Sequence, residues 1–221
     1  MSTPLVILHG WNSQINRWEP FKTQLVKAGY QIYLPALPQD LIRNTHDYSL
    51  WLKDYTKNFP NFCLLGHSFG GQIAVDFTAV NSQRVKKLIL VNSAGIRNKL
   101  NFKRLIFKPV AKVSKWFFPD SLKRIFYRLI NETDYFKASP VMKQTLKKVV
   151  AEDQQINLAK ISCPTLIVWG QNDTLTPLSD GRLIHRLIPN SQLKVLENAR
   201  HGLPFTHAPA LASLVLNFIK Q

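Results

Sequence analysis

The stretch Phe62-Cys63-Leu64-Leu65-Gly66-His67-Ser68-Phe69-Gly70-Gly71 decides the fold of this chain. Its first four residues predict a short buried strand, and residues 72–80 predict a helix that follows at once. Between them lies Gly-x-Ser-x-Gly, which in a strand–turn–helix setting holds a serine hydroxyl above the edge of a sheet. A side chain at Gly66 or Gly70 would clash in so sharp a turn. We therefore expect Ser68 to be a nucleophile that faces the N-terminus of the following helix.

Candidate partners for Ser68 follow two later strands. Residues 164–169 predict a buried strand whose loop carries Asp173, and residues 192–196 predict a strand whose loop carries His201. A serine hydroxyl needs a base to take its proton, and a histidine base needs a carboxylate to orient it. Both candidates come just after the carboxyl end of a strand, where open α/β sheets build their sites. The chain order serine, aspartate, histidine therefore predicts a catalytic triad.

Other residues compete for these partner roles. Asp180 and Glu197 are the alternative acids, but Asp180 is expected near the start of a helix and Glu197 at the end of a strand. His207 is the alternative base, yet it precedes Ala-Pro and is expected where a helix begins, so His201 is preferred. His67, inside the Gly-x-Ser-x-Gly motif, is expected to serve structure through hydrogen bonds.

A further signal lies near the N-terminus, where apolar residues 5–8 predict a strand that runs into His9-Gly10-Trp11-Asn12. Gly10 lets this loop pass close to a substrate, so the Trp11 amide can face a carbonyl oxygen. The Phe69 amide, one residue past the nucleophile, is the expected second donor. Together the two amides are predicted to form an oxyanion hole.

With this set of motifs, the chain resembles the α/β-hydrolase family. The matching motifs are His9-Gly10-Trp11, Gly66-His67-Ser68-Phe69-Gly70-Gly71, residues 164–173, and His201-Gly202 with Pro209 behind it. They span nearly the whole chain except about residues 96–158. The resemblance implies Ser68 as nucleophile, His201 as base and Asp173 as orienting acid. It does not name a substrate, because one fold hosts many chemistries.

Short apolar runs that alternate with helical runs predict an α/β fold, namely a doubly wound, mostly parallel sheet of about six strands. The expected strands are residues 5–8, 31–34, 62–65, 87–91, 165–169 and 192–196. The expected helices are residues 20–28, 50–57 with Ser49 as their cap, 72–80, 178–187 and 209–219. Two departures from the resembled family stand out. Residues 33–38 replace its usual Asp-x-Pro-Gly, and the first strand begins so early that the sheet should be trimmed at the N-terminus.

The chain leaves this sheet after Ser93-Ala94-Gly95, so we expect a hydrolase core of residues 1–95 and 159–221 and a helical cap insertion of residues 96–158. Apolar residues at helical spacing predict cap helices that begin at residues 120–121 and 139–140. A cap over the sheet edge would enclose the substrate and exclude water. For the aromatic residues of the insertion, plain packing between cap and sheet is an equally good interpretation. The candidate pocket residues are Trp11, Phe69, Phe102, Phe107 and Trp116.

Composition sets further bounds. The net charge is +16, and residues 97–148 hold 14 basic residues against 3 acidic ones. A solvated face is the preferred interpretation, weak contact with anionic surfaces is the alternative, and nucleic acid is not an expected partner. No run approaches the roughly 20 apolar residues of a membrane span, and the first strand leaves no room for a signal peptide. The two cysteines are expected to be reduced and buried, which favours a cytoplasmic protein. No residues have metal spacing, so neither metal nor cofactor is expected.

The sequence thus predicts a serine hydrolase that cleaves carboxylic esters through an acyl-enzyme, with a small-molecule acyl substrate. A lactonase, a thioesterase or a hydrolase of a carbon–carbon bond beside a carbonyl would use the same groups. Two functions from other classes remain as alternatives. One is a ligand receptor whose cap signals to a partner, and the other is a binder of anionic surfaces with incidental hydrolysis. A serine at the turn argues against relatives that place an aspartate nucleophile there.

Overall fold

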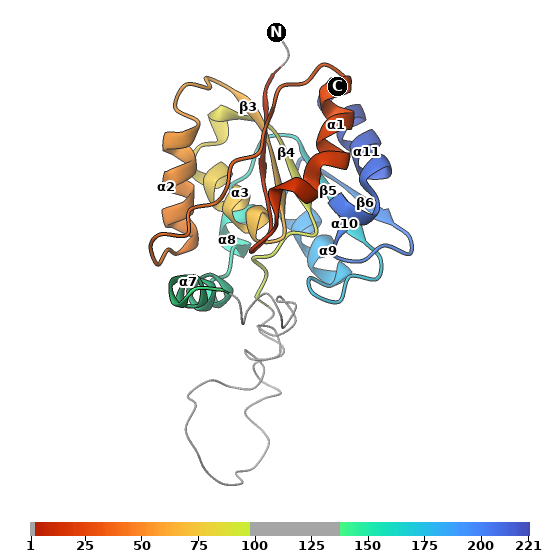
Figure 1. The fold of residues 1–221 in the computed structure, drawn as a ribbon. Helices are drawn as coiled ribbons and strands as arrows, with labels where there is room; N and C mark the ends of the chain where they lie inside the picture. The colour runs from red at the N-terminus through yellow and green to blue at the C-terminus, as the bar shows by residue number, and fades with distance from the viewer. Residues whose placement is uncertain (1–2, 98–137) are drawn as a thin grey trace, which may run out of the picture.

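A computed structural model describes residues 3–97 and 138–221 (Figure 1). One sheet of six parallel strands runs in the order β2-β1-β3-β4-β5-β6, so the expected parallel α/β sheet is confirmed. The strands are β1 (Leu5–Leu8), β2 (Ile32–Tyr33), β3 (Phe62–His67), β4 (Val85–Val91), β5 (Thr165–Gly170) and β6 (Ser191–Leu196). β2 is shorter than expected because it pairs with β1 at only two positions and Pro35, which has no amide hydrogen, follows closely.

Helices cover both faces of the sheet (Figure 1). α2 and α3 lie on one face, and α1 and α11 lie on the other. The helices of the described residues are α1 (Glu19–Lys27), α2 (Thr45–Tyr55), α3 (Phe69–Val80), α7 (Pro140–Ala151), α8 (Gln155–Leu158), α9 (Leu178–Leu187), α10 (Leu203–Thr206) and α11 (Ala208–Lys220). Two short 3-10 helices, η1 (Ile15–Trp18) and η2 (Ser82–Arg84), precede α1 and β4.

Each strand supplies side chains to two hydrophobic cores, because successive residues of a strand point to opposite faces. In β1, Val6 and Leu8 belong to the core under α2 and α3. Leu5 and Ile7 belong to the core under α1 and α11. All residues of β1, β3 and β5 are buried, as a parallel sheet covered on both sides requires. This double burial fixes the strands whose carboxyl ends carry the candidate site.

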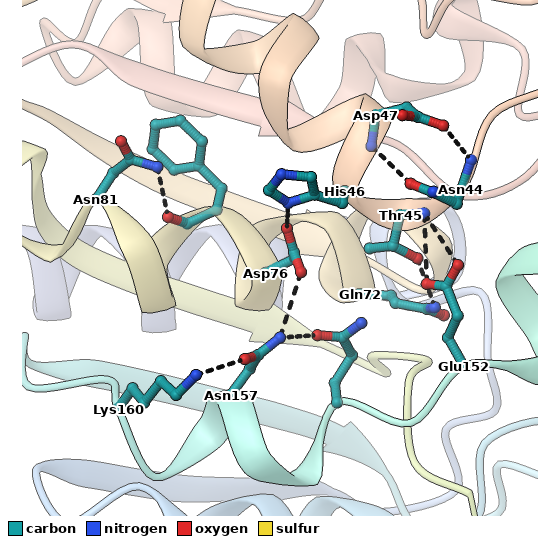
Figure 2. A network of polar contacts seen from close by, with 12 residues as sticks. Asn44, Thr45, His46, Asp47, Gln72, Asp76, Asn81, Glu152, Asn157 and Lys160 are labelled. Atoms are coloured by element: carbon teal, nitrogen blue, oxygen red, sulfur yellow. Dashed lines mark hydrogen bonds and ion pairs between the residues drawn. The ribbon is translucent and has the colours of Figure 1, made fainter.

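The start of α2 corrects one sequence prediction. Ser49 does not cap a helix; it is buried inside α2, which begins four residues earlier. The cap is Asn44, whose side chain accepts a hydrogen bond of 2.8 Å from the Asp47 amide. The Asp47 carboxylate in turn accepts one of 2.8 Å from the Asn44 amide, as Figure 2 shows. This reciprocal pair satisfies two helix-terminal amides, and it outweighs the weaker signal at Ser49.

The helix predicted to begin at Ser139-Pro140 is present as α7. The Ser139 hydroxyl accepts a hydrogen bond of 3.2 Å from the Met142 amide, which caps the first turn. Leu146 and Val149 are buried in the core under α2 and α3. The other predicted cap helix, at residues 120–121, lies outside the described residues. Within the described ranges, no helix is both long enough and apolar enough to cross a bilayer.

Polar contacts join α7 and α8 to the helix that follows the candidate nucleophile, and Figure 2 shows the contact to α8. The Gln72 amide donates hydrogen bonds of 2.8 Å to the Thr45 hydroxyl and to the Val149 carbonyl oxygen. The Asp76 carboxylate accepts one of 3.2 Å from the Asn157 amide. Gln72 and Asp76 are both in α3, so the chain that returns from the insertion is bonded to the helix that begins beside Ser68.

Candidate active site

The turn at Ser68 has the geometry that the motif predicts. Ser68 follows β3 directly and adopts φ 54°, ψ −119°, a backbone conformation that costs a non-glycine residue roughly 1–3 kcal/mol. The turn is held by a 3.1 Å hydrogen bond from the Ser68 amide to the Val91 carbonyl oxygen. A Cβ on Gly66 would lie 2.5 Å from the Gly70 carbonyl oxygen, and one on Gly70 would overlap Leu8. The predicted clash at both glycines is confirmed.

The three predicted triad residues form one continuous chain of hydrogen bonds. His201 Nε2 lies 2.9 Å from Ser68 Oγ, and His201 Nδ1 lies 2.8 Å from Asp173 Oδ2. The Asp173 side chain is fully buried, whereas the His201 side chain is 17% exposed. When Nδ1–H donates to the carboxylate, Nε2 keeps its lone pair and can accept the serine proton. The arrangement can therefore turn a serine hydroxyl into a nucleophile.

The Asp173 carboxylate is held by donors on both oxygens. The amides of Leu175 and Thr176 donate to Oδ1 at 2.8 and 3.1 Å. The Thr176 hydroxyl, at 2.8 Å, and the Asn92 side-chain amide donate to Oδ2. Burial raises the pKa of Asp173, but the hydrogen bonds from His201, Asn92 and Thr176 outweigh it and leave the pKa below its ordinary value. The carboxylate is thus ionised and fixed in place at neutral pH.

Asn92 and Thr176 bond the candidate acid, and neither was predicted from the sequence. Asn92 comes directly after β4, at the same sheet edge as Ser68 and Asp173, so the rule that selected Asp173 could have found it. It adopts φ 44°, in the left-handed region that asparagine tolerates. Thr176 stands three residues after Asp173, a spacing at which side chains often bond local amides.

The alternative triad residues lie elsewhere. Glu197 is exposed just beyond β6. His207 is the residue directly before α11, and its ring contacts the Thr206 hydroxyl at 2.8 Å. Asp180 is in the first turn of α9, where burial, with some help from the charge of Asp173, raises its pKa to about 6. None of these placements reproduces the hydrogen bond that joins Asp173 to His201.

The raised pKa of Asp180 leads to a testable prediction about stability. Its pKa is raised from 3.8 to about 6, so the folded state binds the proton more tightly and loses stability as the pH rises through 6. Asp180→Asn removes this loss. The difference between the free energies of unfolding of Asp180→Asn and wild type should therefore rise by about 1–3 kcal/mol between pH 4 and pH 8. Urea denaturation of both proteins at the two pH values measures it. Ester turnover should stay close to wild type; a crippled Asp180→Asn enzyme would make Asp180 the acid.

The loop after β1 lies against the nucleophile. A Cβ on Gly10 would be 3.3 Å from Ser68 Cβ, which explains why glycine suits this position. The rings of Trp11 and Phe69 meet edge to face with their centroids 5.8 Å apart. Neither the Trp11 amide nor the Phe69 amide donates a hydrogen bond to another group of the described residues. Both N–H groups are therefore without an acceptor within the described ranges.

The candidate pocket residues divide into two groups. The Phe69 ring is buried and packs edge to face on Tyr48 at 5.2 Å, so it belongs to the core under α2. Trp11 is half-buried beside it, and its indole Nε1 has no partner among the described residues. Phe102, Phe107 and Trp116 lie outside the described residues. In residues 3–97 and 138–221, no group of three or more histidine, cysteine or acidic side chains could hold a metal.

Comparison with known proteins now decides the family. The alpha/beta hydrolase family profile matches residues 5–214. The chain belongs to the alpha/beta hydrolase family. A 2-hydroxy-6-oxononadienedioate/2-hydroxy-6-oxononatrienedioate hydrolase of Escherichia coli O81 (strain ED1a) is 26% identical, over 98% of this chain and 87% of its own length.

Solved structures share the hydrolase fold. The enol-lactonase of Burkholderia xenovorans LB400 matches with a TM-score of 0.76 and 18% identity, over 100% of this chain and 92% of its own. The esterase EaEST of Exiguobacterium antarcticum matches with a TM-score of 0.73 and 21% identity, over the same shares of the two chains. At these identities the likeness establishes the fold and leaves the substrate open.

Proposed function

We propose that this protein is a serine hydrolase that cleaves carboxylic esters through an acyl-enzyme. Ser68 is the nucleophile, His201 the general base and Asp173 the orienting acid. The supporting observation is the unbroken chain from Ser68 Oγ through His201 to Asp173, with contacts of 2.9 and 2.8 Å, behind a strained serine turn. Strain at a buried turn persists where the surroundings hold it, and it is concentrated at functional sites.

The reaction follows from this geometry. As Ser68 Oγ attacks the ester carbonyl, His201 Nε2 takes the hydroxyl proton and becomes positively charged. The Asp173 carboxylate holds the Nδ1–H and stabilises that charge. The tetrahedral intermediate collapses, and His201 gives its proton to the leaving alcohol. Water then attacks the acyl-enzyme with His201 again as base, which releases the acid and restores Ser68.

The Trp11 and Phe69 amides are the proposed oxyanion hole. Phe69 is the first residue of α3, so its amide belongs to the positive end of that helix. The oxygen that becomes negative in the intermediate would accept from both amides. Removing one such donor in a serine protease lowers turnover roughly 10²- to 10³-fold, which shows how much an oxyanion hole can contribute to the rate.

A carbon–carbon bond beside a carbonyl is the second candidate substrate. The name of the Escherichia coli relative describes a 2-hydroxy-6-oxo dienedioate, which contains no ester bond. Lactones and thioesters present the same carbonyl to the same serine. All four reactions pass through attack on that carbonyl, so the triad alone does not separate them.

A substrate panel separates these candidates. Purified protein would be assayed with a p-nitrophenyl ester, a lactone, a thioester and a 2-hydroxy-6-oxo dienoate, each also with Ser68→Ala as control. We expect the highest kcat/KM on the ester and loss of that activity in Ser68→Ala. A higher kcat/KM on the dienoate would move the assignment to carbon–carbon hydrolysis. Binding without turnover on every substrate would favour the receptor class instead.

The basic residues of the insertion lie mostly beyond the reach of the structure. α7 buries its apolar side and carries Lys147 and Lys148 between the buried positions, but most of the basic residues counted in the sequence lie outside the described residues. Weak contact with anionic surfaces, and the role of residues 96–158 as a substrate cap, therefore stay predictions.

A further inference from the structure

His67 lies between the two loops that serve the proposed reaction. It ends β3, directly before Ser68. Its Nε2 is 2.9 Å from the His201 carbonyl oxygen, and since a carbonyl only accepts, Nε2 carries the proton. On the other side of the ring, a Cβ on Gly10 would be 3.2 Å from Nδ1. One imidazole therefore touches the nucleophile strand, the loop of the histidine and the loop of the proposed oxyanion hole.

The ring is confined on its remaining sides. Trp18 and Phe205 meet it edge to face, with centroids 5.8 and 6.0 Å away. The guanidinium of Arg17 covers Phe205 at 4.4 Å. His67 is 4% exposed, and Nδ1 is buried with no hydrogen-bond partner in the part of the chain that the structure describes. Leaving one nitrogen of a buried ring unpaired is unfavourable, and the bond from Nε2 and the packing of the ring together offset that cost.

The same surroundings keep the ring neutral. Burial, and to a smaller extent the nearby His201 ring, lowers the pKa of His67 to about 3. The two ring centroids are 5.2 Å apart. In the proposed reaction His201 becomes positively charged, and a second cation at this distance would oppose that step. A neutral donor with one proton on Nε2 avoids this conflict.

We infer that His67 is a positioning residue, which holds the His201 backbone at the distance from Ser68 that proton transfer needs. The hydrogen bond acts on the carbonyl of the same residue whose side chain serves as base. From the sequence alone, His67 is expected to have only a structural role. The inference rests on the proposed function, because it concerns the rate of the step that Ser68 and His201 carry out.

The test is a set of three substitutions at His67. Gln places an amide donor near the position of Nε2, whereas Asn places its amide near Nδ1, too close to the main chain to reach the His201 carbonyl. Leu has no donor and a similar bulk. We expect His67→Leu and His67→Asn to lose roughly 10- to 100-fold in kcat with little change in KM, since a misplacement of about 1 Å costs that much. His67→Gln should recover most of the loss.

An organophosphonate should inactivate His67→Gln almost as fast as wild type, and His67→Leu and His67→Asn more slowly. Circular dichroism should show that each variant is folded. If His67→Leu does not fold, the comparison of Gln with Asn decides. Equal kcat in folded Gln and Asn variants, or a loss that lies only in KM, would overturn the inference. Ser68→Ala is assayed alongside: if it keeps full activity, the proposed function fails, whereas an inactive Ser68→Ala with an unaffected His67→Leu overturns the positioning role alone.

Discussion

Ser68→Ala should lose roughly 10⁶-fold in turnover of a p-nitrophenyl ester, the loss seen when the serine of a protease triad is removed. The reason is that no other hydroxyl of the described residues lies within hydrogen-bond distance of His201 Nε2. Alanine keeps the Cβ and the same positive φ, so the turn gains no new strain and opens no large cavity. The measurement is kcat by steady-state kinetics, with the unfolding midpoint measured on the same sample.

The matched control is Ser213→Ala. Ser213 is exposed on α11 and is not one of the predicted site residues, so its replacement should leave kcat unchanged. Full activity of Ser68→Ala, in a preparation free of other esterases, would contradict the assignment of the nucleophile.

Asp173→Asn should lose roughly 10³ to 10⁴-fold in turnover, by analogy with the serine-protease triad. An asparagine amide in place of Oδ2 presents a donor to His201 Nδ1, which then has to accept. The proton moves to Nε2, and the ring can no longer take one from Ser68. KM should change far less than kcat, because the carboxylate is fully buried and lies behind the ring.

Glu197→Gln is the matched control for this prediction, because Glu197 is an exposed acid near the same histidine in sequence. We expect it to retain the turnover of wild type. A nearly silent Asp173→Asn together with a crippled Glu197→Gln would overturn the assignment of the acid. Asp173→Asn also loses part of the acceptor for Asn92 and Thr176, so its folding has to be checked by circular dichroism.

Much of the fold could be predicted from the sequence because an apolar run identifies a buried strand from neighbouring residues alone. β1, β3 and β5 are buried on both faces, and such strands appear in a sequence as unbroken apolar runs. The turn at Ser68 was readable because only glycine fits at Gly66 and Gly70. The position of the candidate site then follows, since parallel strands bring their carboxyl ends to one edge.

The parts that were missed depend on contacts between distant residues. Asn92 is 81 residues from Asp173, and no spacing in the sequence indicates that its amide reaches that carboxylate. His67 and His201 are 134 residues apart, so their hydrogen bond follows only from the register of β3 and the path of the loop after β6. The start of α2 was missed because Asn44 and Asp47 act as a reciprocal pair, which a single-residue signal at Ser49 does not represent.

The measurement that tests the account most directly is covalent labelling with a fluorophosphonate, followed by peptide mass mapping. The reagent reacts with a serine only where a base activates it and donors hold the developing charge. The account predicts a single added phosphonyl group on the peptide that contains Ser68, no label on Ser68→Ala and slow labelling of Asp173→Asn. A label on another residue, or full ester turnover by a protein that the reagent does not modify, would contradict it.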